Sequence, residues 1–257
     1  MGNAPGNLCK KCTDCFGLKR NRASNANQYI ALTDHSTDST SQEMIEEKKA
    51  DLDPTVFSVD PTEFLEICAM PPSNIFEKLL EKEGFIVYGQ DIDEGFIIKA
   101  EWKSKFTGEE IIKFSRIADL RHSWDKNIDH IEELPTESQN EFITYTILKK
   151  ALIISQREIV MISNIRQMDD GMIVVSKSCD HEKFPETEKF IRMTVYVGGY
   201  YFKNICDGEF KTHAISITKG NFGGTVSSKL AKKATALALP KLYQNMEKCM
   251  EKYYKDR

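Results

Sequence analysis

The final stretch of the chain repeats apolar residues every three to five positions, with Lys and Glu between them. This spacing places the apolar residues on one face of an α-helix. It predicts a long amphipathic helix from Val226 to Tyr253. Pro240 lies inside this stretch. Because proline removes a backbone donor and clashes with the preceding turn, we expect it to bend or break the helix.

A different pattern, short apolar runs separated by turn residues, fills most of the chain before that helix. The runs predict strands at residues 85–90, 96–106, 141–148, 158–166, 172–178, 190–202 and 213–218. Thr107 and Glu110 have the spacing of a capping box, which predicts a helix that continues to Trp124. Residues 63–83 also show a helical pattern, interrupted by Pro71-Pro72. Successive strands with short links indicate an antiparallel sheet, so the fold class is α+β. A curved sheet closed by one long helix leaves room for a cavity between them.

The first fifty residues do not share these patterns. They hold few large apolar residues and are rich in Asn, Ser, Thr, Lys and Asp. A segment of this composition cannot bury enough apolar area to offset its ordering entropy. We therefore predict a disordered tail over residues 1–50 and one folded domain over residues 51–257.

Composition narrows the classes of function. The net charge is −4, with 40% hydrophobic and 10% aromatic residues, so the chain can bury a sizeable core and is not a dominantly basic nucleic-acid binder. Its longest aliphatic runs, such as 151–154 and 159–162, are four residues long, far shorter than the roughly 20 residues of a membrane-spanning helix. The first thirty residues lack the apolar stretch of a secretory signal. The seven cysteines are an odd number, so a disulfide framework is not expected. We predict a cytoplasmic monomer, held at any membrane by something other than a helix.

The tail nevertheless carries a signal for peripheral membrane attachment. The chain begins Met1-Gly2-Asn3, like a myristoylated protein, although Gly6 stands where the acceptor motif has Ser or Thr. Cysteines and basic residues follow, and a palmitoyl chain or a polybasic patch would supply the second signal that stable attachment needs. The predicted acceptors are Gly2 for myristate and Cys9, Cys12 and Cys15 for palmitate. An unmodified tail stays open as an alternative. A zinc site formed by the three cysteines with His35 ranks behind acylation, because no second ligand cluster completes the tetrahedron.

Six strings in the folded part resemble the START domain, the lipid-transfer module related to steroidogenic acute regulatory protein. The strings are Arg121-His-Ser-Trp-Asp-Lys-Asn-Ile128, Ser155-Gln-Arg-Glu-Ile-Val160, Val175-Ser-Lys-Ser-Cys-Asp-His181 with Pro185, Phe190-Ile-Arg192, Gly223-Gly224 and Pro240. Their order and spacing match over about residues 60–255. The resemblance implies the helix-grip fold of START and Bet v 1-like proteins, in which an antiparallel sheet wraps around a long C-terminal helix and encloses an apolar tunnel. It also implies a non-enzymatic protein that binds one lipid, and no cofactor other than that lipid.

Arg121 and Asp125 lie four residues apart, so they share one face of a helix. Spacing alone fits an exposed ion pair of little energetic weight. The resemblance implies instead that both face the deep end of the tunnel, where the arginine meets a polar head group and the acid balances it in the empty protein. Phosphocholine-transfer members use an aromatic cage, but Thr146 and Ile159 stand at what we take to be two of its positions, so cation–π binding of choline is not expected. Thr146 and Ser176 resemble polar positions with which ceramide-transfer members bind their ligand. The head group stays open between phospholipid, ceramide and sterol.

The segment 149–154 places two lysines beside four apolar residues. The resemblance implies that it forms a gate with the last helix, and this composition suits insertion at an anionic membrane surface. The predicted gate residues are Leu152, Ile153, Ile154 and Phe222. The pattern fits a buried strand end equally well, and Phe222 also fits a packed aromatic residue at a helix start.

Other residues with chemical potential are interpreted as structural. Trp124 is predicted to anchor the core, and Arg157 and Glu158 to pin the strand after the gate segment. Cys179-Asp180-His181 is interpreted as a turn, because a nucleophile and its base are usually brought together by the fold and seldom lie side by side in sequence. No catalytic residue is predicted. An enzyme of the wider helix-grip superfamily and a lipid-gated signalling module remain alternatives.

Overall fold

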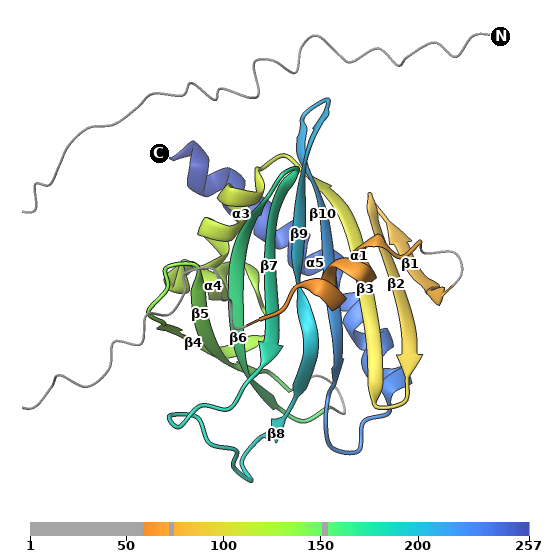
Figure 1. Cartoon of the computed structure of the whole chain (residues 1–257), viewed down its shortest axis with the longest axis vertical. Coiled ribbons are helices and arrows are strands. Elements are labelled where there is room, and N and C mark those ends of the chain that lie inside the picture. The colour runs from red at the N-terminus through yellow and green to blue at the C-terminus, as the bar shows by residue number, and fades with distance from the viewer. Residues whose placement is uncertain (1–58, 72–74, 151–153, 257) are drawn as a thin grey trace, which may run out of the picture. The chain divides into compact units, whose positions relative to one another are not determined.

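A computed structural model of the chain describes residues 59–71, 75–150 and 154–256 (Figure 1). The predicted acylation residues Gly2, Cys9, Cys12 and Cys15 lie outside these ranges, as does the tail predicted over residues 1–50. The predicted gate residues Leu152 and Ile153 also lie outside them. The described residues belong to one unit, Phe57–Arg257.

Within the described ranges, ten strands form a single sheet in the order β1-β2-β3-β10-β9-β7-β6-β5-β4, with β8 paired to β6. The strands are β1 Glu77–Lys82, β2 Phe85–Ile92, β3 Gly95–Ser104, β4 Ile128–Pro135, β5 Glu141–Leu148, β6 Arg157–Met168, β7 Gly171–Ser178, β8 Ile191–Arg192, β9 Thr194–Asp207 and β10 Phe210–Asn221. Neighbours along this order pair antiparallel, and only the short β8 runs parallel to β6. The predicted antiparallel sheet is therefore confirmed.

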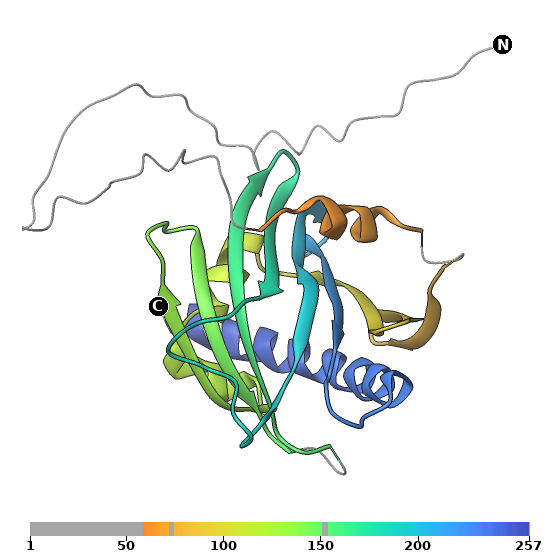
Figure 2. The ribbon, with the colours of Figure 1, turned by 60° about the horizontal axis from the view of Figure 1, so that its bottom comes forward.

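The long C-terminal helix lies along one face of the curved sheet, and a shorter helix lies across the other face (Figure 2). The described helices are α1 Thr62–Ala69, α3 Gly108–Ser115, α4 Ala118–Trp124 and α5 Ser228–Lys255. This is the helix-grip arrangement that the resemblance implied. None of these helices combines the length and the hydrophobicity needed to span a bilayer.

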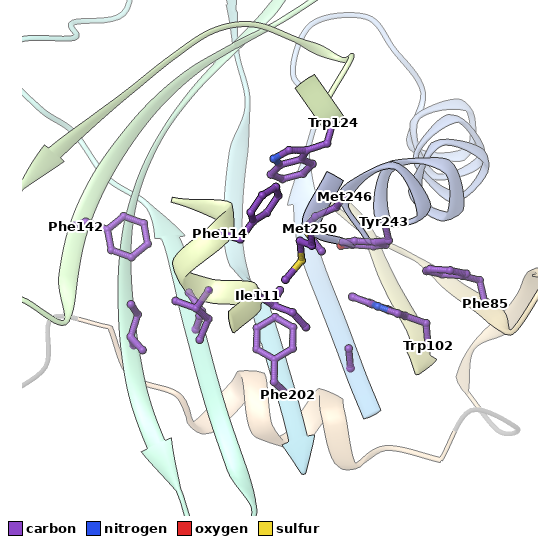
Figure 3. Close-up of a cluster of buried hydrophobic side chains, with 14 residues drawn as sticks. Phe85, Trp102, Ile111, Phe114, Trp124, Phe142, Phe202, Tyr243, Met246 and Met250 are labelled. Carbon is purple, nitrogen blue, oxygen red and sulfur yellow. The ribbon is translucent and has the colours of Figure 1, made fainter. Parts of the chain in front are cut away.

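Both faces of the sheet centre are buried. Neighbouring residues of a strand point to opposite faces, so a single strand contributes to two apolar clusters. On β7, Val174 joins the cluster beneath α5 and α3, whereas Ile173 and Val175 join the cluster beneath α1. The cluster beneath α5 is rich in aromatic side chains (Figure 3). Its labelled members are Phe85, Trp102, Ile111, Phe114, Trp124, Phe142, Phe202, Tyr243, Met246 and Met250. The sheet is thus held between two apolar layers, and the aromatic layer faces the long helix.

The prediction of a broken helix over residues 63–83 is wrong in its second half. Helix α1 ends at Ala69, just before Pro71-Pro72, where the prolines end the helix as expected. The segment 77–82 is strand β1, which pairs with β2 at one edge of the sheet. Its charged residues are exposed, so its pattern of mixed Leu, Lys and Glu reflects an edge strand rather than a helix face.

The helix predicted to continue to Trp124 is in fact two short helices, α3 and α4. Its capping box is confirmed: Thr107 Oγ1 accepts from the backbone N–H of Glu110 at 3.2 Å, and Glu110 Oε2 accepts from the backbone N–H of Thr107 at 2.8 Å. Pro240 was expected to bend or break the last helix, and the break is wrong, since α5 continues through that residue.

Candidate functional site

Two adjoining cavities lie between α5 and the sheet. The first, of about 170 Å³, reaches beneath α3 and is named the α3 cavity. The second, of about 250 Å³, runs along Val195, Gly198 and Gly199 of β9 and is named the β9 cavity. For scale, a buried cavity of roughly 150 Å³ admits benzene. The two share residues of their walls, namely Arg121, Thr146, Met161, Ser176, Tyr200, Leu242 and Tyr243. The fold therefore leaves a space between α5 and the sheet that is lined by both apolar and polar side chains.

The structure brings the four predicted head-group residues to this space from three parts of the fold. Arg121 on α4, Thr146 on β5 and Ser176 on β7 line both cavities, and Asp125 lines the β9 cavity. Ser163 on β6 lies opposite Ser176, and their hydroxyls are 2.7 Å apart with both residues buried. Ser163 was not predicted. It becomes a neighbour only through the register of β6 and β7, which the sequence pattern does not specify.

The guanidinium of Arg121 is held inside the wall. Its Nη2 donates to Asp125 Oδ2 at 3.3 Å, and its Nη1 donates to the backbone oxygen of Ser115 at 3.4 Å. Its Cζ lies 4.1 Å from the ring centroid of Trp124, close enough for a cation–π contact. The side chains of Arg121 and Asp125 are only 22% and 8% exposed, so the alternative of a surface ion pair is wrong.

Burial raises the pKa of Asp125 above its ordinary value, although Arg121 and the backbone N–H of Asn127 lower it. The burial of the carboxylate therefore destabilises its charged form more than the interactions with Arg121 and Asn127 stabilise it. The contact with Arg121 is long, and Arg121 Nε has no hydrogen-bond partner among the described residues. The guanidinium thus retains donor capacity for another acceptor inside the protein.

Arg157 and Glu158 hold the start of β6, as interpreted, and neither lines a cavity. Arg157 Nε donates to the backbone oxygen of Phe222 at 3.3 Å. Glu158 accepts from the Tyr145 hydroxyl at 2.7 Å and from Arg192 Nη2 at 2.9 Å. Trp124 is buried in the cluster beneath α5, as predicted for a core anchor.

The two predicted gate residues that the structure describes, Ile154 and Phe222, do not project from the surface. Ile154 is buried, and Phe222 is half-buried with its ring edge-on to Phe96 at 5.4 Å between centroids.

Cys179 lies just after β7, and burial raises the pKa of its thiol, whereas an activated cysteine has a lowered pKa. Within the described ranges, no group of His, Cys, Asp and Glu is arranged to hold a metal ion.

Residues 109–256 match the family model described as START domain. The chain is similar to Ceramide transfer protein from Homo sapiens and from Cricetulus griseus, each 26% identical over 133 residues that make up 47% of this chain and 21% and 22% of those proteins. The chain thus spans about a fifth of the length of these curated relatives. Its fold is similar to human StAR-related lipid transfer protein 5, with a TM-score of 0.67, 18% identity, and coverage of 75% of this chain and 93% of that one. Human STARD10 gives a TM-score of 0.67, 16% identity, and coverage of 79% and 84%.

Proposed function

Because the chain belongs to the START domain family, we propose that it binds a single lipid in the α3 and β9 cavities and transfers or senses that lipid at membranes. The observation that supports this most directly is the pair of adjoining cavities, lined mainly by apolar side chains, with Arg121 in the wall that they share. Each methylene moved from a bilayer into water costs about 0.8 kcal/mol. A carrier therefore needs an apolar interior that can hold the hydrocarbon part of the lipid.

The polar residues are proposed to hold the head group. Arg121 would contact it, Asp125 would balance the guanidinium in the unloaded protein, and Thr146 and Ser176 would donate or accept hydrogen bonds. The lipid is proposed to be a phospholipid or a ceramide-like lipid. The ceramide-transfer relatives favour lipid binding of this general kind, although they extend far beyond the shared region.

We propose that no bond is made or broken. No histidine or cysteine lines either cavity among the described residues. Of the other charged groups there, Arg116 is engaged with Glu133 at 2.7 Å. The lining thus offers no evident pair of nucleophile and base, which argues against an enzyme of the helix-grip superfamily.

Native mass spectrometry of the purified full chain tests this function. The expected result is a 1:1 complex with one lipid, or its formation after incubation with mixed phospholipid and ceramide vesicles. A chain that carries no lipid and takes none from vesicles would exclude the proposed function.

An exposed face of α5 supports docking at an anionic membrane. Leu230 and Leu237 are 38% and 60% exposed, seven residues apart on one side of the helix. Lys229, Lys233 and Lys241 are also exposed. From Ser228 to Met246 the sequence has no Asp or Glu. Leucines among lysines suit the boundary between head groups and acyl chains. We propose that this face meets the membrane together with the predicted gate residues Leu152 and Ile153, whereas Ile154 and Phe222 pack inside the fold.

The double variant Leu230→Asp/Leu237→Asp is expected to lower binding to phosphatidylserine-containing vesicles by about tenfold, because it removes apolar insertion and adds charge that anionic lipids repel. Vesicle cosedimentation measures this loss. Lys177→Asp is a matched control, since it changes the net charge by the same amount at an exposed position on β7. Equal losses in both variants would show a general charge effect and would remove α5 from the docking surface.

The acylation of Gly2 and of Cys9, Cys12 and Cys15 also belongs to this proposal. It rests on the sequence of the tail. Myristate with palmitate, or with the basic residues, would keep the chain at a membrane. Such a chain would exchange lipid locally rather than shuttle freely, as a cytoplasmic but peripherally attached protein.

A further inference from the structure

Two neighbouring glycines of β9, Gly198 and Gly199, line the β9 cavity, and they are glycines for different reasons. Gly199 has a φ of +137°, and a Cβ placed on it would collide with the backbone oxygen of Val174 on the next strand. Glycine adopts this conformation without a steric penalty, whereas residues with a Cβ rarely do. The backbone therefore requires a glycine at position 199.

The backbone does not require a glycine at position 198. The φ of Gly198 is not in the positive range. The three atoms nearest to a Cβ built there are Val195 Cγ1 at 3.0 Å, the backbone oxygen of Ile217 at 3.4 Å and that of Ser176 at 4.0 Å. The one tight contact is with the end of a side chain. The absence of a side chain at this position thus calls for a reason other than strand geometry.

Position 198 faces the space beneath α5. Alternate residues of a strand share a face, and Tyr200 and Phe202 of the same strand line the α3 cavity. Gly198 pairs with Ser176 of β7 and with Thr218 of β10, and both of these residues also line the β9 cavity. The inward face of β9 therefore changes from large aromatic rings to bare backbone where the β9 cavity lies.

The missing side chain widens the cavity and does not lengthen it. In the order of the sheet, β9 is the middle strand, so Gly198 lies in the floor of the space under α5. Apolar side chains border the same cavity, with Val195 on β9 and Leu239 and Leu242 on α5. A cavity of about 250 Å³ leaves these side chains with fewer packing contacts in the unloaded protein. A hydrocarbon chain in the cavity would restore those contacts.

Building on the proposed lipid binding, we infer that Gly198 determines which class of lipid the chain accepts, because it makes room for the second hydrocarbon chain of a two-chain lipid. A leucine side chain at this position would enter the β9 cavity and is about as thick as one hydrocarbon chain. A lipid with a single chain would still fit beside it. A phospholipid or a ceramide, with two chains, would not.

Gly198→Leu tests this inference with two pairs of lipids that differ in the number of chains. The pairs are phosphatidylcholine with lysophosphatidylcholine, and ceramide with sphingosine. Wild type and variant, as full chains, are titrated with each lipid, and native mass spectrometry measures the bound fraction. The variant is expected to bind the two-chain member of the pair that wild type accepts about tenfold more weakly, and the single-chain member within about twofold of wild type, since only the second chain competes with the new side chain for one packed space.

Thr194→Leu is the matched control. It adds the same side chain to the same strand, at an exposed position that lines neither cavity, and it should bind every lipid as wild type does. Gly198→Ala keeps the test decisive if the leucine variant does not fold. It adds one methyl group at an allowed φ and should weaken two-chain lipids alone, by about threefold. Urea unfolding establishes that each variant is folded before its binding is compared.

The other outcomes overturn the inference, each in a different way. Equal losses for single-chain and two-chain lipids would make position 198 a packing position without selectivity. Wild-type binding of two-chain lipids by a folded Gly198→Leu would show that the second chain lies elsewhere. A wild-type chain that accepts single-chain lipids alone would refute the two-chain assignment while leaving lipid binding intact. Uptake of no lipid by the wild type would instead refute the proposed function itself.

Discussion

Arg121→Ala is expected to reduce the rate of lipid transfer between vesicles by about a hundredfold. Truncating one partner of a buried, hydrogen-bonded charged contact costs roughly 2–5 kcal/mol, and each 1.4 kcal/mol is tenfold in affinity. The guanidinium lies at the wall shared by both cavities. Removing it takes away the cation that the head group is proposed to meet. A fluorescent lipid moved from donor to acceptor vesicles gives the rate.

Arg116→Ala is the matched control for this variant. Arg116 also lines the α3 cavity, but Glu133 Oε1 accepts from its Nη2 at 2.7 Å and from its Nε at 3.2 Å. Its guanidinium is therefore already satisfied, and its loss should change transfer far less. Arg121→Ala/Asp125→Asn checks that any defect does not come from an unbalanced Asp125. Wild-type transfer by both variants of Arg121 would contradict the head-group assignment.

The sequence predicted the centre of the fold better than its edges. The long helix and the central strands carry strong apolar periodicity, because they are buried against one another. Strands β1 and β4 form the two edges of the sheet, and neither was predicted as a strand. Charged residues make up most of β1 and interrupt β4, and both strands are partly exposed, so burial imposes little alternation on them. Pairing with a neighbour, rather than local pattern, makes these segments strands.

The candidate site could also be predicted only in part. The spacing of Arg121 and Asp125 is the same for an exposed pair and for a buried one, so only the packing of α4 against α5 and the sheet distinguishes them. The resemblance to START domains favoured the buried arrangement of this pair. The position of Ser163 beside Ser176 could not be predicted, because it depends on the register of β6 and β7.

Glu158→Ala is expected to lower the free energy of unfolding by about 3–5 kcal/mol, the usual cost of leaving a buried charge without its partner. The side chain of Glu158 is 2% exposed and that of Arg192 is 14% exposed. Glu158 Oε1 accepts from Arg192 Nη2 at 2.9 Å and from its Nε at 3.1 Å, and Oε2 accepts from the Tyr145 hydroxyl. The variant would remove the acceptor of the Tyr145 hydroxyl and leave Arg192 only its bond to the backbone oxygen of Phe184 at 3.0 Å. Urea unfolding should show a lower midpoint at an unchanged slope.

The control breaks an exposed ion pair instead. Lys113 Nζ lies 2.6 Å from Glu109 Oε1, with the two side chains 72% and 63% exposed. Lys113→Ala should cost less than about 1 kcal/mol, because water screens such pairs. A similar small cost for Glu158→Ala would mean that the buried network contributes no more than a surface pair.

The position of this network connects stability to the cavity. Glu158 and Arg192 face each other where β8 pairs with β6, and the backbone N–H of Met193 donates to the backbone oxygen of Glu158 at 2.8 Å. Met193 and Val195 follow directly and line the β9 cavity with Ile159. Without the carboxylate, the segment that forms this wall loses its main polar attachment to β6. Glu158→Ala should therefore weaken lipid retention at temperatures well below its unfolding midpoint, whereas Lys113→Ala should not, and lipid dissociation measured on the two variants separates these cases.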